Sequence, residues 1–481
     1  MPELFRKIFI ANRGEIACRA IRTCKELGIE AVAGYSESDR LSKHVHMADE
    51  SVFLGPSPSQ QSYLNIERVI QAAVQTGCDA VYPGYGFLAE NATFAEACEN
   101  AGLAFIGPSA DVIRVMGDKE ETRRTFKKYG IPVVPGLEDI DSVEDIVNFG
   151  NEVGWPVLLK AAAGGGGKGM EKVNTPGEVA EAWERTRSIA TKAFGDGRVY
   201  VEKFIERSRH IEYQFVGDQF GNAIHLGERE CSIQRHHQKL IEEAPSVVLS
   251  PEMRKEMGDL VVNAVSRIGY VTAGTMEFIY DPRGDKLYAI EVNTRIQVEH
   301  TVTEMISGLD LIRLMIETRA GFPLPFKQED VSLFGHALEC RINAEDPKKN
   351  FLPSAGPIQY LRIPSGPFVR LDSGVYQGWT VPVYYDSMLA KLCVFAVDRK
   401  TAIQRMLRAL NEFELLGVKT TVPLHKEILK HPEFQEGNYD TFFIDDHKET
   451  LMEYEEDEVE ILKIAKLLAE SSALGRNQHC F

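Results

Sequence analysis

Two glutamates, Glu277 and Glu291, fall where a pair of carboxylates could share a metal ion. Residues 275–280 and 286–293 have the composition of two strands around a turn centred near Gly284, which places the glutamates opposite each other on one face. Carboxylates that face each other repel unless a cation compensates them. Mg²⁺ held by these carboxylates and by phosphate oxygens would resolve the conflict. The alternative, an exposed acidic sheet face, is disfavoured by the apolar residues that flank both glutamates.

The segment that follows carries polar side chains at every second position: Glu291, Asn293, Arg295, Gln297 and Glu299. In an extended chain all of these side chains would point to one side. Arg295 and Gln297 could orient a small planar oxyanion through forked hydrogen bonds, and Glu299 would then lie within reach as a base. A mixed-charge solvent face would give the same pattern, but the adjoining carboxylate pair favours a site for an anion and a metal.

A glycine run follows a predicted strand that ends at Lys160, and residues 161–170 read AAAGGGGKGM. Such a run is a poor helix or strand, whereas its successive backbone N–H groups could wrap a phosphate. It is not a Walker loop, because Lys168 is followed by Gly169 instead of Ser or Thr. A flexible linker is the alternative, but linkers seldom have lysines at both edges.

Residues 228–239 read ERECSIQRHHQK, and their two adjacent histidines suggest zinc at first sight. Neighbouring side chains point apart in a regular element, and Cys231 is an insufficient addition to a ligand set. Polar contacts to a nucleotide or substrate are therefore the preferred interpretation.

Composition limits the class of protein that could hold these groups. The chain has 481 residues, 44% hydrophobic and 26% charged, which fits a globular enzyme with several lobes. Its 54 basic and 71 acidic residues give a net charge of −17, which disfavours nucleic acid as a partner. It contains no apolar stretch long enough to span a membrane and no signal-peptide core, and its eight scattered cysteines include no CxxC pair. We expect a cytoplasmic protein with reduced thiols.

The elements that must position the site change in character along the chain. Strands alternate with helices over the first 115 residues, which predicts a parallel sheet. Its first turn, ANRGEIA, lacks the GxGxxG spacing, so nicotinamide chemistry is disfavoured. Beyond residue 206, longer strands and hairpin turns predict an antiparallel sheet packed with helices. Thr301 and Glu304 have capping-box spacing, which predicts one helix that ends at Gly321.

Five strings together identify a family: KAAAGGGGKGM (160–170), EVNTRIQVEH (291–300), GYGFLAEN (84–91), MGDK (116–119) and YYDSM (384–388). Over residues 5–446 the chain resembles the biotin carboxylases of the ATP-grasp superfamily. The resemblance implies an α/β plus α+β fold and a homodimer. It divides the chain into an N-terminal Rossmann-like (pre-ATP-grasp) domain at 1–115, an ATP-grasp domain at 116–330, a C-terminal biotin carboxylase domain at 331–447 and an acidic, then amphipathic tail at 448–481. The ATP-grasp domain would include a mobile lid at about 133–204.

The resemblance also implies a ligase reaction and a role for each matching residue. ATP phosphorylates bicarbonate to carboxyphosphate, and the carboxyl group then moves to a ureido nitrogen of biotin. Glu299 would be the base, Arg341 would stabilise the biotin enolate, Lys239 and Arg295 would complete the catalytic set, and Gln297, Val298 and Tyr85 would complete the bicarbonate and biotin pocket. Glu277, Glu291 and Asn293 would bind two Mg²⁺ ions, or Mn²⁺. The remaining ATP contacts would be Lys119, Lys160, Gly165, Gly166, Met170, Glu202, Lys203, Ile205, His210, Gln234 and His237.

Two departures from the family and one absence complete the comparison. Glu171-Lys172 stands where the family usually has Arg-Val, and an acidic residue there would weaken the attraction of the lid for phosphate. Thr301 replaces the usual proline. The chain contains no Met-Lys dipeptide of the kind that carries biotin, so the carrier and the carboxyltransferase are expected on separate chains. The alternatives are another ATP-grasp ligase that joins a carboxylate to an amine, and a nucleotide-binding regulatory subunit without catalysis.

Overall fold

The first strands of the chain form a five-stranded parallel sheet in the order β3-β2-β1-β4-β5, as the alternating pattern predicts. The computed structural model describes residues 2–138, 140–162 and 169–454. The strands are β1 (Lys7–Ile10), β2 (Glu30–Ser36), β3 (Glu50–Gly55), β4 (Ala80–Tyr82) and β5 (Ala104–Phe105). The helices of this part are α1 (Gly14–Glu26), α2 (Lys43–Met47), α3 (Ile66–Gln75), α4 (Ala92–Asn100) and α5 (Ala110–Gly117).

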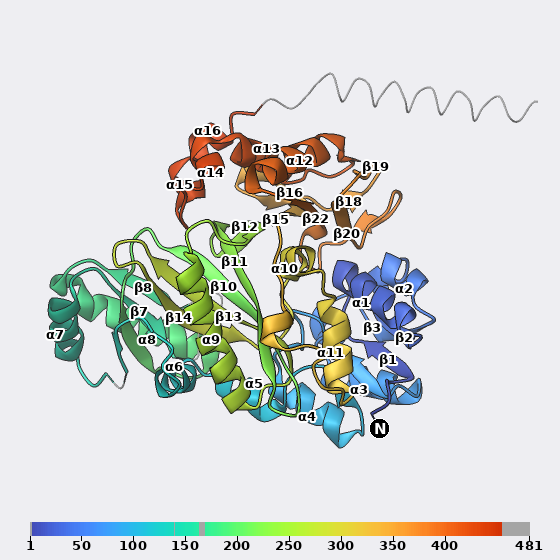
Figure 1. Cartoon of the computed structure of the whole chain (residues 1–481), viewed down its shortest axis with the longest axis horizontal. Coiled ribbons are helices and arrows are strands. Elements are labelled where there is room, and N and C mark those ends of the chain that lie inside the picture. Colours follow the sequence, from blue (N-terminus) through green and yellow to red (C-terminus); the bar gives the residue numbers. More distant parts are fainter. Residues whose placement is uncertain (1, 139, 163–168, 455–481) are drawn as a thin grey trace, which may run out of the picture.

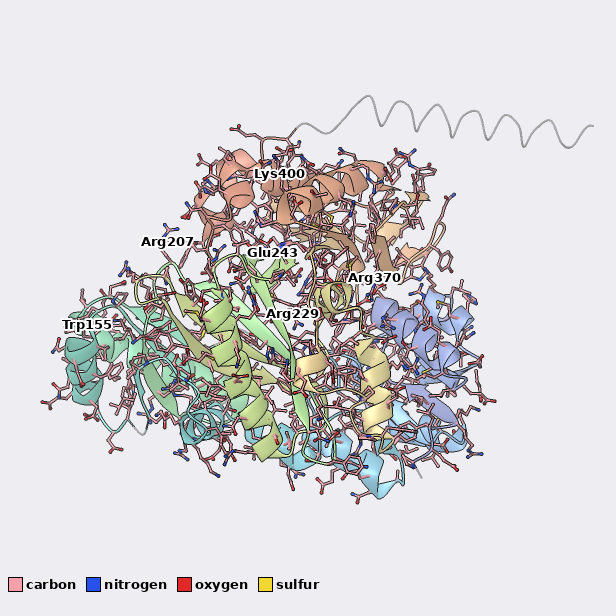
Figure 2. The ribbon with its side chains drawn as sticks, viewed as in Figure 1. Trp155, Arg207, Arg229, Glu243, Arg370 and Lys400 are labelled. Atoms are coloured by element: carbon pink, nitrogen blue, oxygen red, sulfur yellow. The ribbon has the colours of Figure 1, made fainter. Side chains whose placement is uncertain are left out.

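The lid predicted at about 133–204 contains a small antiparallel sheet in the order β6-β9-β7-β8. Its strands are β6 (Gly136–Leu137), β7 (Val157–Ala161), β8 (Met170–Val173) and β9 (Val199–Lys203). They pack through a separate apolar cluster against α7 (Val143–Val153) and α8 (Val179–Phe194). In Figure 1 these elements form a lobe at the left of the molecule, and Trp155 lies toward its outer end in Figure 2.

The largest sheet has eight antiparallel strands in the order β14-β13-β10-β11-β12-β15-β22-β20. The strands are β10 (Arg209–Gly217), β11 (Ala223–Arg235), β12 (Gln238–Ala244), β13 (Thr272–Asp281), β14 (Lys286–Asn293), β15 (His336–Asn343), β20 (Val369–Ser373) and β22 (Met388–Ala396). Because β12 pairs with β15, the sheet runs across the domain boundary expected at residue 330.

Helices cover this sheet and link it to the N-terminal part. The helices are α6 (Lys119–Lys128), α9 (Pro251–Ile268), α10 (His300–Ser307), α11 (Leu311–Arg319), α12 (Arg399–Glu412), α13 (Val422–Lys430), α14 (Pro432–Glu436), α15 (Phe443–Asp446) and α16 (Lys448–Leu451). Short strands β16 (Glu345–Asp346), β17 (Leu352–Pro353), β18 (Gly356–Pro357), β19 (Tyr360–Arg362), β21 (Thr380–Val381) and β23 (Glu414–Leu416) pair at the edge of the C-terminal part. In Figure 1 the C-terminal elements lie at the top and the N-terminal sheet at the lower right.

The single helix predicted from Thr301 to Gly321 is wrong, because the chain forms α10 and α11 with a break at Gly308. Gly308 ends α10 with a φ of 72°, a conformation that glycine adopts without strain. Glu304 does not cap the helix but binds Arg19 and Arg370. Asp310 then caps α11 by accepting a hydrogen bond from the backbone of Arg313.

The seven described cysteines are buried and free, as expected of thiols that pack as small apolar groups. Within the described part of the chain, none of the helices combines the length and the apolar content needed to cross a membrane. Most of the expected tail, from residue 455 onward, lies outside the described residues.

Candidate active site

One cavity of about 1450 Å³ lies where the N-terminal part, the lid sheet and the eight-stranded sheet meet. Every site residue predicted from the sequence that falls within the described ranges lines this cavity. They are Tyr85, Lys119, Lys160, Met170, Glu202, Lys203, Ile205, His210, Gln234, His237, Lys239, Glu277, Glu291, Asn293, Arg295, Gln297, Val298, Glu299 and Arg341. Gly165, Gly166 and Lys168 lie outside the described residues.

The predicted hairpin is formed by β13 and β14, and Glu277 is the register partner of Glu291. Glu277 is 5% exposed, and its Oε1 accepts hydrogen bonds from Asn293 Nδ2 at 2.8 Å and Gln297 Nε2 at 2.6 Å. Burial alone would raise the pKa of Glu277, but the charges of Lys239 and His210 outweigh it and hold the pKa well below its usual range. Glu277 is therefore a buried anion.

Glu291 responds differently to the same surroundings. Burial raises its pKa, the negative charge of Glu277 raises it further, and Lys119 only partly opposes them. The two facing carboxylates thus lack sufficient positive charge from the protein for both to ionise easily. A divalent cation with oxygen preference fits this pair of carboxylates. Asn293 lies beside them, with its amide nitrogen toward Glu277 and its amide oxygen toward Arg295. His210 and Glu212 also offer ligand atoms within 4.8 Å of those of Glu277.

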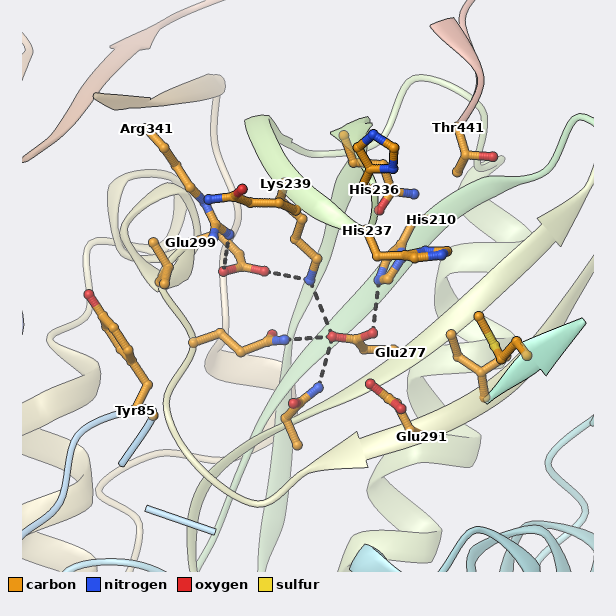
Figure 3. A pocket seen from close by; sticks show the side chains of 18 of the residues that line it. Tyr85, His210, His236, His237, Lys239, Glu277, Glu291, Glu299, Arg341 and Thr441 are labelled. Atoms are coloured by element: carbon orange, nitrogen blue, oxygen red, sulfur yellow. Dashed lines mark hydrogen bonds and ion pairs between the residues drawn. The ribbon is translucent and has the colours of Figure 1, made fainter. Parts of the chain in front are cut away.

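Lys239, from the start of β12, lies at the centre of the charged network (Figure 3). Its Nζ is 2.7 Å from Glu212 Oε2, 3.2 Å from Glu277 Oε1 and 2.6 Å from Glu299 Oε1. Three carboxylates from three different segments are thereby held by one ammonium group. Burial lowers the pKa of Lys239, but these carboxylates outweigh it and raise the pKa well above the ordinary value, so the lysine is a cation.

Glu299 lies between two cations, since its other oxygen accepts a hydrogen bond from Arg341 Nη2 at 2.9 Å. Burial favours its neutral form, but Lys239, Arg341 and Arg229 together hold the pKa of Glu299 well below the ordinary value. The side chain is 2% exposed. It is therefore a nearly inaccessible, ionised carboxylate at the wall of the cavity, which is the form that a proton acceptor requires.

The segment from Glu291 to Glu299 is extended only as far as Asn293, so the predicted continuous period-two strand is wrong beyond that residue. After Asn293 the chain bends, and the fully buried Ile296 packs into the core shared with the N-terminal sheet. The polar side chains still converge on the cavity, but a turn brings them there instead of a strand face.

Arg295 and Gln297 line the cavity on the side of Glu277 and Glu90. Arg295 Nε donates to Glu90 Oε2 at 2.8 Å and its Nη2 donates to Asn293 Oδ1 at 2.8 Å. Gln297 donates from its amide nitrogen to Glu277. Both side chains line the cavity, and their N–H groups could donate to an oxyanion there.

The opposite end of the cavity is formed by the lid sheet and the β11–β12 hairpin. Lys160 Nζ is 2.5 Å from Glu202 Oε2 across neighbouring strands. Burial lowers the pKa of Lys119, and nearby Glu291 partly opposes this effect. The hairpin turns at His236 and His237 with φ of 48° and 64°, and His237 lines the cavity. This end could hold a nucleotide with its phosphates toward Lys119 and Lys160.

The prediction that Glu171 weakens the attraction of the lid for phosphate is wrong, because Glu171 points away from the cavity. Side chains alternate along β8, so Met170 and Lys172 line the cavity whereas Glu171 faces α8. Arg185 on that helix donates two hydrogen bonds to Glu171 Oε1, at 2.5 Å and 3.1 Å. The Nζ of Lys172 lies 4.5 Å from the centre of the Phe204 ring. Lys172, which stands where the family usually has valine, therefore adds a cation to the wall of the cavity.

Four contributors escaped the sequence analysis: Glu15, Glu212, Arg229 and Lys391. Tyr85 donates a hydrogen bond from its hydroxyl to Glu15 Oε1, and Lys391 Nζ is 3.3 Å from the same oxygen. Lys391 also donates to the carbonyl oxygen of Val298 at 2.7 Å. The only signal for Glu15 was its place in ANRGEIA. Glu212 and Lys391 are charged residues within largely apolar strands, and Arg229 lies between Glu228 and Glu230, and an exposed sheet face would also produce these patterns.

Comparison with known proteins agrees with this geometry. Three family models match the chain: the N-terminal domain of biotin carboxylase at residues 4–113, the ATP binding domain of the carbamoyl-phosphate synthase L chain at 118–327, and the C-terminal domain of biotin carboxylase at 339–446. Biotin carboxylase 1 of Bacillus subtilis is 52% identical over 443 residues, covering 92% of this chain and 98% of the relative. The chain belongs to the biotin carboxylase family. The family and the fold class predicted from the sequence are thereby confirmed.

Two further members extend the comparison. A pyruvate carboxylase subunit of Methanothermobacter thermautotrophicus is 47% identical, covering 99% of this chain and 99% of the relative. The biotin carboxylase domain dimer of Hydrogenobacter thermophilus 2-oxoglutarate carboxylase, solved with MgADP, ADP and bicarbonate, is 48% identical with a TM-score of 0.90. That match covers 94% of this chain and 100% of the solved chain.

Proposed function

We propose that the protein uses ATP and bicarbonate to carboxylate biotin on a separate carrier protein, through carboxyphosphate. The observation that carries the proposal is the Lys239–Glu299–Arg341 network beside the facing carboxylates Glu277 and Glu291, all in one cavity. This arrangement combines a base, cations for an oxyanion and a metal-ligand pair, the three features that the two half-reactions require.

The nucleotide would occupy the end of the cavity between the lid sheet and the β11–β12 hairpin. Glu277, Glu291 and Asn293 would hold two Mg²⁺ ions, or Mn²⁺, and these ions supply charge neutralisation on the triphosphate. The adenine and ribose contacts proposed are Glu202, Lys203, Ile205, His210, Gln234 and His237, and the phosphate contacts Lys119, Lys160, Gly165, Gly166 and Lys239, with Met170 at the wall.

Bicarbonate would bind between Arg295, Gln297, Lys239 and the backbone of Val298, with Glu299 as the proton acceptor. A bicarbonate oxygen attacks the γ-phosphorus, the bond from phosphorus to the ADP oxygen breaks, and the bicarbonate proton moves to Glu299. In the second half-reaction, the bond from the carboxyl carbon to the phosphate oxygen breaks, the released phosphate takes the proton of a ureido nitrogen, and the carboxyl carbon bonds to that nitrogen. Arg341 would stabilise the negative charge on the ureido oxygen, next to Tyr85.

We propose a carrier and a carboxyltransferase on other chains, a homodimer, and a location in the cytoplasm. The coverage of 99% in both directions with a pyruvate carboxylase subunit supports action as one subunit of a larger assembly. The dimer of the Hydrogenobacter relative supports the homodimer. The domain division at residues 115, 330 and 447, with the lid at about 133–204, is part of the same proposal.

The test is ATP turnover by the intact protein with labelled bicarbonate and free biotin, and without an added amine. We expect ADP release that depends on bicarbonate, and label that appears in carboxybiotin in the presence of biotin. Turnover that requires an amine would favour a carboxylate–amine ligase. Tight ATP binding without any turnover would favour a regulatory subunit, and either result would overturn the proposal.

A further inference from the structure

Arg229, on the central strand β11, is fully buried and yet has an acceptor for each of its five N–H groups. Figure 2 shows it near the middle of the molecule. Its Nε donates to Glu212 at 2.6 Å, its Nη1 to Gln214 at 2.7 Å and Thr303 at 3.0 Å, and its Nη2 to Thr275 at 3.1 Å and Gln297 at 2.8 Å. The acceptors come from four different segments, so the guanidinium group fixes them relative to one another.

The contact with Gln297 decides which way its amide group points. Because Gln297 Oε1 accepts from Arg229 Nη2, its Nε2 must point the other way, toward Glu277 and the cavity. A flipped amide would bring N–H groups against the guanidinium group and an oxygen against the Glu277 carboxylate. Both contacts would be repulsive, so Arg229 makes Gln297 a hydrogen-bond donor to whatever anion enters.

Arg229 also acts on Lys239 through Glu212. One oxygen of Glu212 accepts from Arg229 and the other lies 2.7 Å from Lys239 Nζ, so the carboxylate is held from both sides. Lys239 is thereby kept close to Glu299. The buried guanidinium group thus sets the position of two donors of the anion pocket without lining the cavity itself.

We propose that Arg229 is a positioning residue for the bicarbonate pocket: it orients the Gln297 amide and, through Glu212, the Lys239 ammonium group. The proposal rests on the function proposed above, because it assigns the oriented donors to bicarbonate. It predicts a selective effect. None of the five acceptors of Arg229 belongs to the lid sheet or to the adenine contacts proposed above. Lys239 is shared with the proposed phosphate contacts, but Lys119 and Lys160 also serve those phosphates, so loss of the Arg229 hydrogen bonds should affect bicarbonate more than ATP.

The test uses Arg229→Lys in the intact protein. The lysine keeps a positive charge opposite Glu212 but cannot reproduce the planar five-donor fork. We expect the KM for bicarbonate to rise at least tenfold and the KM for ATP to stay within about twofold of wild type. In a double-mutant cycle with Gln297→Met, the two effects on the bicarbonate KM should be clearly less than additive, because both changes remove the same oriented donor.

Two buried threonines give a matched pair of variants. Thr275 and Thr303 each accept one hydrogen bond from Arg229. Thr275 accepts from Nη2, the nitrogen that also donates to Gln297, whereas Thr303 accepts from Nη1. Thr275→Val should raise the KM for bicarbonate but not the KM for ATP. Thr303→Val should lower thermal stability by a similar amount but leave the KM for bicarbonate near that of wild type. This pair decides the question even if Arg229→Lys does not fold.

Equal increases in both KM values, full additivity with Gln297→Met, or identical behaviour of the two threonine variants would overturn the positioning role. These outcomes presuppose a wild-type protein that turns over ATP in response to bicarbonate. If the wild type shows no such turnover, the proposed function fails instead, so the two failures are distinguishable.

Discussion

Three buried glutamates surround Arg341, and their charge states differ because their partners differ. Glu299 has two cations in direct contact and a strongly lowered pKa. Burial raises the pKa of Glu242 to about 8, although Arg341 contacts it at 2.5 Å. Burial likewise raises the pKa of Glu339 to about 7. The positive charge of one arginine does not stabilise three carboxylates in a low-dielectric interior. Glu299, which Lys239 also contacts, is the one that keeps its negative charge.

Glu299→Gln tests the base at the residue scale. The amide matches the carboxylate in shape but cannot take a proton, so we expect normal ATP binding and a loss of about 10²-fold or more in biotin carboxylation. Labelled bicarbonate incorporation measures the rate, and calorimetry measures nucleotide affinity. The exposed Glu256→Gln is the control. Near-normal carboxylation by Glu299→Gln would show that the base is another group.

Glu339→Gln tests the cost of a buried carboxyl group that folding makes harder to ionise. Its pKa rises from 4.5 to about 7, so between these values the folded protein holds a proton that the unfolded chain has lost. The free energy of unfolding must therefore fall as pH rises through this range. The amide of the variant cannot ionise, so the variant should gain about 1–3 kcal/mol relative to wild type between about pH 5 and about pH 8.

Denaturant unfolding of both proteins over this pH range measures that gain. The hydroxyl of Thr301 donates to Glu339, and a glutamine oxygen can accept the same hydrogen bond, so the variant keeps this contact. A stability difference that does not change with pH would contradict the prediction.

Sequence patterns identified the residues that belong to a series and missed those that act alone. Glu277 and Glu291 were predicted because a hairpin turn fixes their register, and Glu299 because it ends a polar series. Arg229 was missed because a charged run such as Glu228-Arg229-Glu230 has the same pattern whether its arginine faces water or lies fully buried. Only the strands packed around it show that its five donors are satisfied.

At the scale of elements, local patterns predicted strands well and their ends poorly. The β13–β14 hairpin has the predicted register. The strand predicted through Glu299 instead ends at Asn293, because burial of Ile296 in the core shared with the N-terminal sheet bends the chain. Packing between segments that are distant in sequence therefore decides where this strand ends, and the short-range periodicity of the sequence does not indicate such packing.

Strand β8 offers a prediction in which neighbouring residues serve as test and control. Lys172→Ala removes the cation that faces the cavity, and we expect the KM for ATP to rise about threefold to tenfold, as for loss of one partly exposed charge contact. Glu171→Ala removes a carboxylate that binds Arg185 on the far side of the strand and should leave this KM unchanged. Steady-state kinetics with ATP as the varied substrate compares them. A larger effect of Glu171→Ala would mean that the strand presents the opposite face to the nucleotide.

At the scale of the whole molecule, the active site exists only where three separate parts of the chain meet. The eight-stranded sheet crosses the expected domain boundary through the β12–β15 pairing, which joins residues far apart in the sequence. No local pattern indicates this pairing, since antiparallel strands are neighbours in sequence only when a hairpin joins them. The continuous sheet places Arg341 on β15 beside Lys239 on β12, so the charged network of the site spans both parts.

The pair formed by Glu15 and Lys391 links the N-terminal helix α1 to strand β22 and tests this assembly. Both side chains are almost completely buried, and Lys391 also holds the Val298 carbonyl oxygen. Lys391→Met leaves Glu15 buried without its cation and should cost about 3–5 kcal/mol of stability. Adding Glu15→Gln removes the uncompensated charge, so the double variant should recover much of that loss, as measured by thermal unfolding of the three variants and wild type. If the double variant instead loses the sum of the two single effects, the ion pair contributes no coupling between the two parts.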